Sequence, residues 1–204
     1  MATTTTSTPN VNVIKLRNVR LAFPQLFTPK AVKAGDTPSF SALFLIEPTD
    51  PQVAEIKKAM AAAAKTKWGE KAAEVIKSLT AGDRLCLHNG DAKSDYQGFP
   101  GMLFVSSRTK TKPLVLDADK SILDERAGRP YSGCYVVASL DIFAQDNEFG
   151  KRINAGLRGV QFLRDGDAFA GGAPASLDEF DDMSSGAGAG DMENSAADDL
   201  TDFL

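Results

Sequence analysis

The chain has 204 residues, of which 43% are hydrophobic and 25% are charged, and its formal net charge is -4. These proportions are typical of a globular protein, and no apolar run reaches the ~20 residues of a membrane-spanning helix. The opening residues, MATTTTSTPNVNV, lack the basic and apolar regions of a secretory signal, so we expect a cytoplasmic protein.

The chain is predicted to begin with a flexible segment followed by two strands. Residues 1–10 are mostly Thr and Ser, a composition that does not support a packed structure. Runs of strand-forming residues follow at 11–23 and 39–47. Residues 24–38 between them contain Pro and Gly and are interpreted as a loop.

A helical insertion is predicted at about 50–80. Apolar residues recur at helical spacing from Asp50 to Trp68, with Asp50 at the N-cap and Pro51 at the first helical position. A second helix is predicted at 70–79 and ends just before a glycine, as helices commonly do.

Strand patterns return in the second half of the chain. They are separated by a glycine-rich loop at 90–101 and occupy residues 83–89, 102–117, 131–146 and 151–166. The absence of a regular strand–helix alternation argues against a doubly wound parallel sheet. The order favours a mostly β fold, an antiparallel barrel of the OB-fold type with one helical insertion.

This pattern divides the chain into three parts. Residues 1–10 form a flexible N-terminus, residues 11–170 form the OB-fold domain, and residues 171–204 form a disordered acidic tail. The tail prediction rests on low hydrophobicity, same-sign charge and many Gly, Ala and Ser residues, which cannot repay the entropy of folding.

Charge is distributed unevenly along the chain. Residues 1–164 contain all 23 basic residues and 16 of the 27 acidic ones, for a net charge of +7, whereas residues 165–204 contain 11 acidic and no basic residues. A basic domain followed by an acidic segment indicates a protein that binds a polyanion and carries a mimic of it. The alternative is an ordinary solvated surface with a disordered end.

The residues that catalysis or metal binding would need are scarce. His88 is the one histidine, and its alternating surroundings favour a position on a strand surface. Cys86 and Cys134 lie in apolar runs and are predicted to be reduced and buried. With His88 they do not make a structural zinc set. We therefore predict no catalytic residue, no metal and no cofactor.

Basic residues are instead interleaved with aromatic ones, the mixture that single-stranded nucleic acid requires. Cations follow the phosphates while flat side chains stack on bases, at ~1–3 kcal/mol per base. The predicted contacts are Lys93, Tyr96, Phe99, Arg108, Lys110, Lys112, Tyr131, Phe143, Lys151 and Arg152. Other phenylalanines have apolar neighbours and are predicted to lie in the core, namely Phe23, Phe27, Phe40, Phe44 and Phe162.

Several segments resemble a tailed-bacteriophage family of single-stranded-DNA-binding proteins. They are residues 19–30, 39–50, 96–117, 129–147 and 153–172, which include the stretches YSGCY and VQFLRDG. The resemblance implies an OB-fold that binds and protects single-stranded DNA, largely independent of sequence, during phage replication and recombination. It implies no small-molecule substrate and no membrane, and it places the protein in the host cytoplasm. A strand-annealing recombination mediator and a structural virion protein remain alternatives.

The end of the chain, DDLTDFL, is similar to the acidic tails of bacterial and phage single-stranded-DNA-binding proteins. The resemblance implies that the tail regulates DNA binding and that its tip docks in replication or recombination proteins. The predicted partner-binding residues are Asp198, Asp199, Asp202, Phe203 and Leu204. The chain departs from the Pro-Phe ending of the bacterial tails, because its last residue is Leu204 and Phe203 is penultimate. This difference leaves open whether the partners are host proteins or phage-encoded ones.

Overall fold

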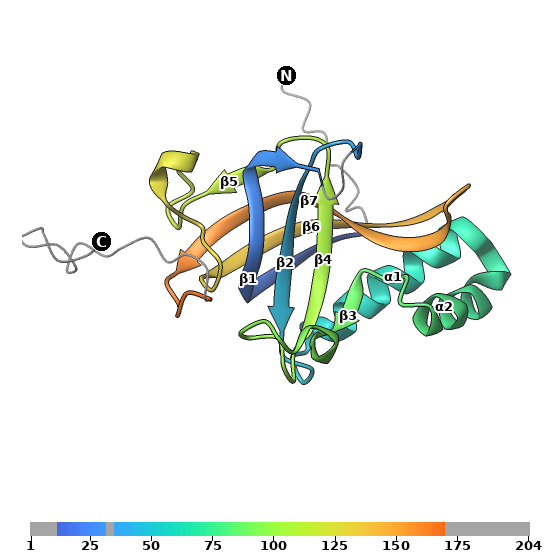
Figure 1. The fold of residues 1–204 in the computed structure, drawn as a ribbon. Coiled ribbons are helices and arrows are strands. Elements are labelled where there is room, and N and C mark those ends of the chain that lie inside the picture. Colours follow the sequence, from blue (N-terminus) through green and yellow to red (C-terminus); the bar gives the residue numbers. More distant parts are fainter. Residues whose placement is uncertain (1–11, 32–34, 170–204) are drawn as a thin grey trace, which may run out of the picture. The chain divides into compact units, whose positions relative to one another are not determined.

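The computed structural model describes residues 12–31 and 35–169, in which strands wrap into a barrel with two helices beside it (Figure 1). The predicted flexible N-terminus, 1–10, and the predicted acidic tail, 171–204, lie outside the described residues. The predicted partner-binding residues at 198–204 therefore also lie outside them.

Five strands close the barrel: β1 (Val13–Lys30), β2 (Ser39–Ile46), β4 (Leu103–Thr109), β6 (Tyr135–Asn147) and β7 (Gly150–Arg164). β1 pairs antiparallel with β2 and β6, β2 with β4, and β6 with β7. A short parallel pairing of β4 with β7, in which Ser107 lies opposite Ala155, completes the circle. Two short strands, β3 (Leu87–Asn89) and β5 (Leu114–Leu116), extend the sheet at β4 and β7. The closed, mostly antiparallel barrel confirms the predicted OB-fold class.

The barrel interior is filled by alternate residues of the strands, because successive side chains of a strand point to opposite faces. Leu16, Phe44, Val105 and Leu140 come from four different strands, and none has more than a trace of exposed surface. Burying a side chain of this size stabilises the fold by about 1.5–3 kcal/mol relative to exposure. The predictions that Phe40, Phe44 and Phe162 lie in the core are confirmed, and Phe27 is partly buried against it.

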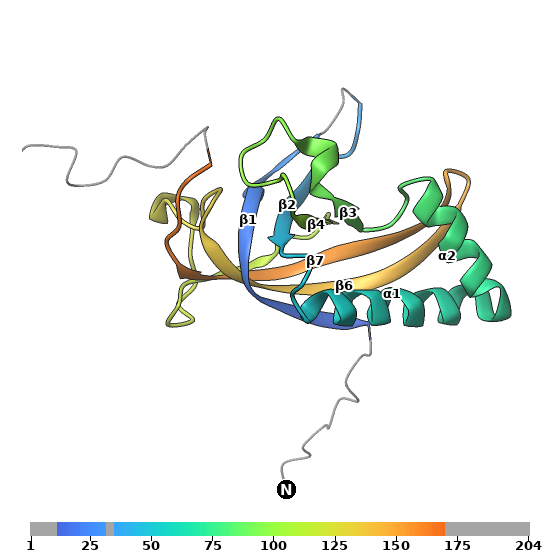
Figure 2. The same ribbon diagram turned by 90° about the horizontal axis from the view of Figure 1, so that it is seen from below.

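The helical insertion is confirmed as α1 (Gln52–Trp68) and α2 (Ala72–Ala81), joined by a short 3-10 turn. Asp50 Oδ1 accepts a hydrogen bond of 2.8 Å from the Gln52 amide, which satisfies a free donor of the first turn. The apolar stripe of α1 joins the barrel core, and the helix lies along β6 and the start of β1 (Figure 2). At its end, Trp68 Nε1 donates to Asp146 Oδ2 at 3.0 Å, which ties α1 to β6.

β1 is longer than predicted. It continues to Lys30 through residues interpreted as loop, with Gln25 opposite Ser41 and Lys30 opposite Ser39. Register shifts interrupt the pairing on either side of Gln25. A bulge accommodates Pro24, which has no amide hydrogen to donate to the ladder. The predicted strand 102–117 is likewise two strands, β4 and β5, separated by a turn.

Cys86 and Cys134 are both buried and free, as predicted. Burial raises the pKa of each thiol to about 12, so both are protonated at neutral pH. Among the described residues, neither helix has the length and apolar character needed to cross a membrane.

Candidate nucleic-acid interface

The outer face of β2 and β4 brings together side chains from three barrel strands. Ser41 lies opposite both Gln25 of β1 and Arg108 of β4, and Leu43 lies opposite Ser106. Directly opposite residues of neighbouring strands share a face, and this face is the reverse of the one that buries Phe44. In OB-folds, the outer face of the second and third barrel strands is where oligonucleotides bind.

At one end of this face stand two exposed rings, Phe23 of β1 and Tyr96 of the 90–101 loop, which we call the aromatic pair. Phe23 is 44% exposed and Tyr96 is 48% exposed. The two rings meet edge to face, with centroids 5.0 Å apart and an interplanar angle of 89°. Lys93 Nζ lies 5.5 Å from the Tyr96 centroid. The pair therefore offers aromatic surface with a cation beside it.

The aromatic pair rests on the buried ring of Phe99. The positions of Phe99 and Phe23 differ from two of the predictions. Phe99, predicted to contact the ligand, is fully buried, with its centroid 5.9 Å from that of Phe23 and 5.3 Å from that of Phe104. The loop buries it by folding back onto the sheet, where Gly90 N donates to Met102 O. Phe23, predicted to lie in the core, is exposed because its φ of 47° and the neighbouring bulge break the alternation of β1.

Arg108 is exposed near the end of β4, between Ser41 of β2 and Gly156 of β7. No described residue forms an ion pair with its guanidinium. Its neighbour on β7 is Gly156, and a Cβ at Gly156 would lie 3.6 Å from Cε1 of Phe143 on β6. The Phe143 ring, 42% exposed, therefore lies across the glycine from Arg108. α1 packs on the Ile142 side of β6, so it does not cover Phe143.

A hydrogen-bonded chain also reaches this face. His88 Nδ1 lies 2.8 Å from Asp83 Oδ1, His88 Nε2 lies 3.1 Å from Ser106 Oγ, and the imidazole stacks on Phe104. The order of groups is that of a hydrolase triad, but the Ser106 amide donates to Cys86 O and is not free to stabilise an oxyanion. These hydrogen bonds instead fix the Ser106 hydroxyl, two residues before Arg108 on the same strand.

One buried acceptor is unpartnered on the same face. Gln25 Oε1 accepts no hydrogen bond from any residue of the described ranges. A buried polar atom left unpaired costs about 1–3 kcal/mol.

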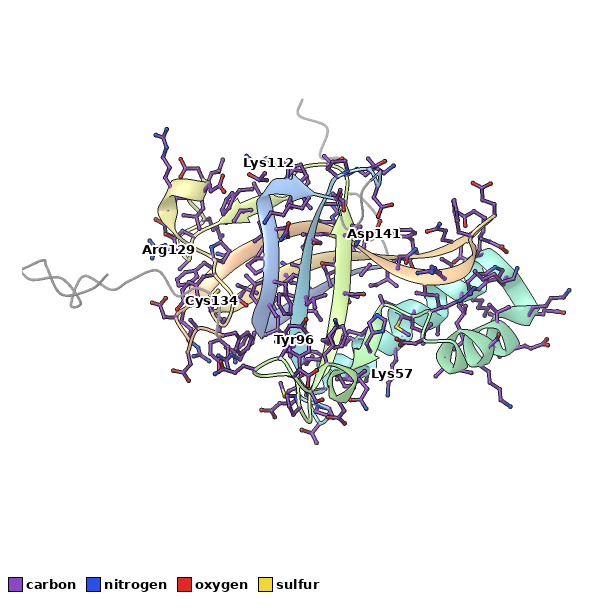
Figure 3. The ribbon with its side chains drawn as sticks, in the orientation of Figure 1. Lys57, Tyr96, Lys112, Arg129, Cys134 and Asp141 are labelled. Atoms are coloured by element: carbon purple, nitrogen blue, oxygen red, sulfur yellow. The ribbon has the colours of Figure 1, made fainter. Side chains whose placement is uncertain are left out.

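The remaining predicted contacts are dispersed. Lys110 and Lys112 are exposed beyond the end of β4, and Figure 3 shows Lys112 at the opposite end of the barrel from Tyr96. Lys151 and Arg152 lie at the start of β7, where Lys151 Nζ contacts Asp146 Oδ2 at 2.6 Å. This hydrogen bond lowers the pKa of Asp146, and the hydrogen bond from Trp68 lowers it further by a smaller amount.

Tyr131 is partly buried, with its ring against the barrel core, and its predicted contact with the ligand stays a prediction. Its hydroxyl donates to Asp165 Oδ1 at 2.9 Å, and desolvation raises its pKa. Tyr131 therefore holds the segment that follows β7.

Sequence reasoning missed Phe23, Gln25 and His88 as residues of this face. For Phe23, the adjacent Pro24 was an available signal, because a proline inside a strand marks an edge or a bulge. Gln25 and His88 have no comparable local signal. Their place on the face depends on strand pairing.

Known proteins resemble the chain over most of its length. Residues 12–192 match the family described as Enterobacter phage Enc34, ssDNA-binding protein. "Putative protein p50" of Acyrthosiphon pisum secondary endosymbiont phage 1 is 47% identical over 174 residues, which are 84% of this chain and 94% of that protein.

Two solved structures have similar folds. The single-stranded DNA-binding protein from bacteriophage Enc34 in complex with ssDNA has a TM-score of 0.65 and 29% identity, covering 78% of this chain and 90% of that one. Gp2.5, a single-stranded DNA binding protein of bacteriophage T7, has a TM-score of 0.52 and 9% identity, covering 91% and 98%. At that identity, the second likeness concerns the fold alone.

Proposed function

The chain belongs to the family of the ssDNA-binding protein of Enterobacter phage Enc34, and from this we propose that it binds single-stranded DNA on the outer face of β2 and β4. Family membership agrees with the prediction of a binding protein that is not an enzyme. We further propose that it acts in phage DNA replication and recombination in the cytoplasm of the host cell, a proposal that the phage origin of its relatives supports.

The observation that supports this face is the gathering of stacking surface and unpaired charge on it. The aromatic pair stands at one end, Arg108 lies on β4 without an ion-pair partner among the described residues, and Phe143 lies across β7. Bases stack on the rings while the cation neutralises a phosphate. Every base has an aromatic face and every nucleotide a phosphate, so this binding is largely independent of sequence.

The acidic C-terminal segment is proposed to compete with DNA for this face. It begins directly after Phe169, whose ring packs in the same cluster as Phe99 of the 90–101 loop. Because the segment is covalently joined to the domain, its charges have an effective concentration in the millimolar range at the face. DNA affinity then falls by the fraction of protein in which the segment occupies the face. The apolar tip, Phe203 and Leu204, is proposed to bind replication or recombination proteins.

Titration of the full chain with labelled oligothymidylate, with unlabelled single-stranded and duplex competitors at several salt concentrations, tests the proposal. We expect the single strand to compete far better than the duplex and binding to weaken steeply with salt. Equal competition by the duplex, or binding that salt does not weaken, would overturn it. Acceleration of duplex formation from complementary oligonucleotides would indicate that the protein also anneals strands.

A further inference from the structure

The described chain ends in a short segment, Asp165–Phe169, that leaves β7 and crosses back over the barrel; we call it the strap. Besides the bond from Tyr131 to Asp165, the Phe169 amide donates to Ser132 O at 3.1 Å. A Cβ at Gly133, where φ is +106°, would lie 2.2 Å from Asp167 O. The backbone of the strap therefore touches the backbone of the segment that precedes β6. The strap therefore follows a defined path.

This path brings Phe169 into a cluster that is separate from the barrel core. Phe169 is 7% exposed and packs with Ala22, Leu45, Phe99 and Phe104 on the outer side of the sheet. The Arg20 guanidinium lies 4.4 Å from the Phe169 centroid, and its Nε donates to Gly133 O at 3.1 Å. Phe169 is thus fixed from the sheet side and from the side of the strap.

The 90–101 loop rests directly on Phe169. Gly98 has a φ of +84°, and a Cβ there would lie 2.5 Å from both Cε1 and Cζ of the Phe169 ring. Only glycine permits this approach, because any side chain would displace the ring or the loop. The neighbouring Phe99 is the ring on which the aromatic pair stands. Phe169, Gly98, Phe99 and Tyr96 therefore form one continuous series of contacts.

We propose that Phe169 is a positioning residue for single-stranded-DNA binding, one that holds the 90–101 loop so that Tyr96 stands beside Phe23. This rests on the proposed function. Phe169 is buried and does not contact DNA; it acts through the loop. Without the Phe169 ring, the loop loses a packing contact and Tyr96 is no longer held in place before DNA binds. Ordering Tyr96 on binding costs free energy, which reduces the affinity.

The test compares oligothymidylate binding by the full-length Phe169→Ala variant and by the parent. We expect affinity to fall about 5-fold or more, near the lower end of what one lost base stack costs. The salt slope should stay unchanged because no charge is removed. Leu163→Ala is the matched control: this leucine lies near the end of β7, is 41% exposed and belongs to neither buried cluster, so its loss should leave affinity unchanged.

A double-mutant cycle separates positioning from general damage. If Phe169 acts through Tyr96, the Phe169→Ala change should have little further effect in a Tyr96→Ala background. Losses that add in full would overturn the proposal. Gly98→Ala breaks the same contact from the loop side and should reproduce the Phe169→Ala phenotype, so the conclusion does not depend on a single variant being well folded.

Trypsin cleavage after Lys93, without DNA, gives a readout that is independent of binding. The Phe169→Ala and Gly98→Ala proteins should be cut there faster than the parent and the Leu163→Ala protein. If the parent binds no oligothymidylate, the proposed function fails, and the cleavage rates still decide whether Phe169 holds the loop. Unchanged cleavage in both loop-contact variants would overturn the positioning role.

Discussion

Replacing Arg108 by Ala isolates one phosphate contact of the proposed interface. The side chain is exposed and no described residue forms an ion pair with it, so its removal leaves no partner unpaired. A surface change of this kind alters the free energy of unfolding by less than about 0.5 kcal/mol. The variant should therefore melt like the parent, and any loss of binding reflects the interface itself.

The magnitude follows from counterion release. For single strands, the logarithm of the binding constant falls with the logarithm of salt concentration at a slope of about 0.7 per neutralised phosphate. Losing Arg108 should reduce the slope by about 0.7. When salt rises from about 50 mM to about 200 mM, the affinity ratio of parent to variant should shrink by about 2.6-fold.

The assay is fluorescence anisotropy with a labelled oligothymidylate at four or more salt concentrations. Arg108→Lys keeps the charge and should keep the slope. Lys57→Ala removes a cation from α1, which packs along β6 and β1, and should also keep the parent's slope (Figure 3). If Arg108→Ala retains the parent's slope, or if Lys57→Ala loses as much slope as Arg108→Ala, the outer face of β2 and β4 is not the path of the phosphates.

Three further predictions concern other parts of the chain. Tyr96→Ala should weaken oligothymidylate binding by about 1–3 kcal/mol at an unchanged salt slope, whereas Ile122→Ala, which removes a side chain that is 79% exposed outside this face, should have no effect in the same titration. Deleting residues 171–204 should tighten binding, most at low salt where charge is least screened; equal affinities of the two proteins at low salt would contradict tail competition. The free energy of unfolding should fall as the pH rises above about 9, because the unfolded thiols ionise there while burial holds the folded pKa of Cys86 and Cys134 at about 12. Urea denaturation at pH 8 and at about pH 10 should show a smaller fall for Cys86→Ala than for the parent, and an equal fall would count against the buried thiol as the cause.

Local patterns were sufficient for much of the fold. α1 was predictable because Asp50, Pro51 and the apolar stripe are all short-range signals of one helix. The burial of Cys86 and Cys134 followed from their apolar neighbours in the sequence. Each of these features depends on residues within a turn or two along the chain, so the order of amino acids alone specifies it.

Other features depended on contacts between distant residues, which no local pattern encodes. Phe99 looks exposed in its Gly- and Pro-rich loop, yet Phe104 and Phe169 belong to the cluster that buries it. Phe23 looks like a core residue, yet the bulge before Gln25 turns it outward. In both cases tertiary packing overrides the expectation from neighbouring residues.

The candidate interface likewise has features that the sequence alone predicts and features that only tertiary contacts determine. Composition and the uneven charge were enough to predict a polyanion ligand, because net charge is a sum over residues and needs no coordinates. Which cation shares the face with which ring was decided only when β4 paired with β7 and closed the barrel. That pairing sets Arg108 opposite Gly156, and the missing side chain of Gly156 lets the Phe143 ring lie across it. Adjacency of this kind arises from strand register, a property of the folded chain.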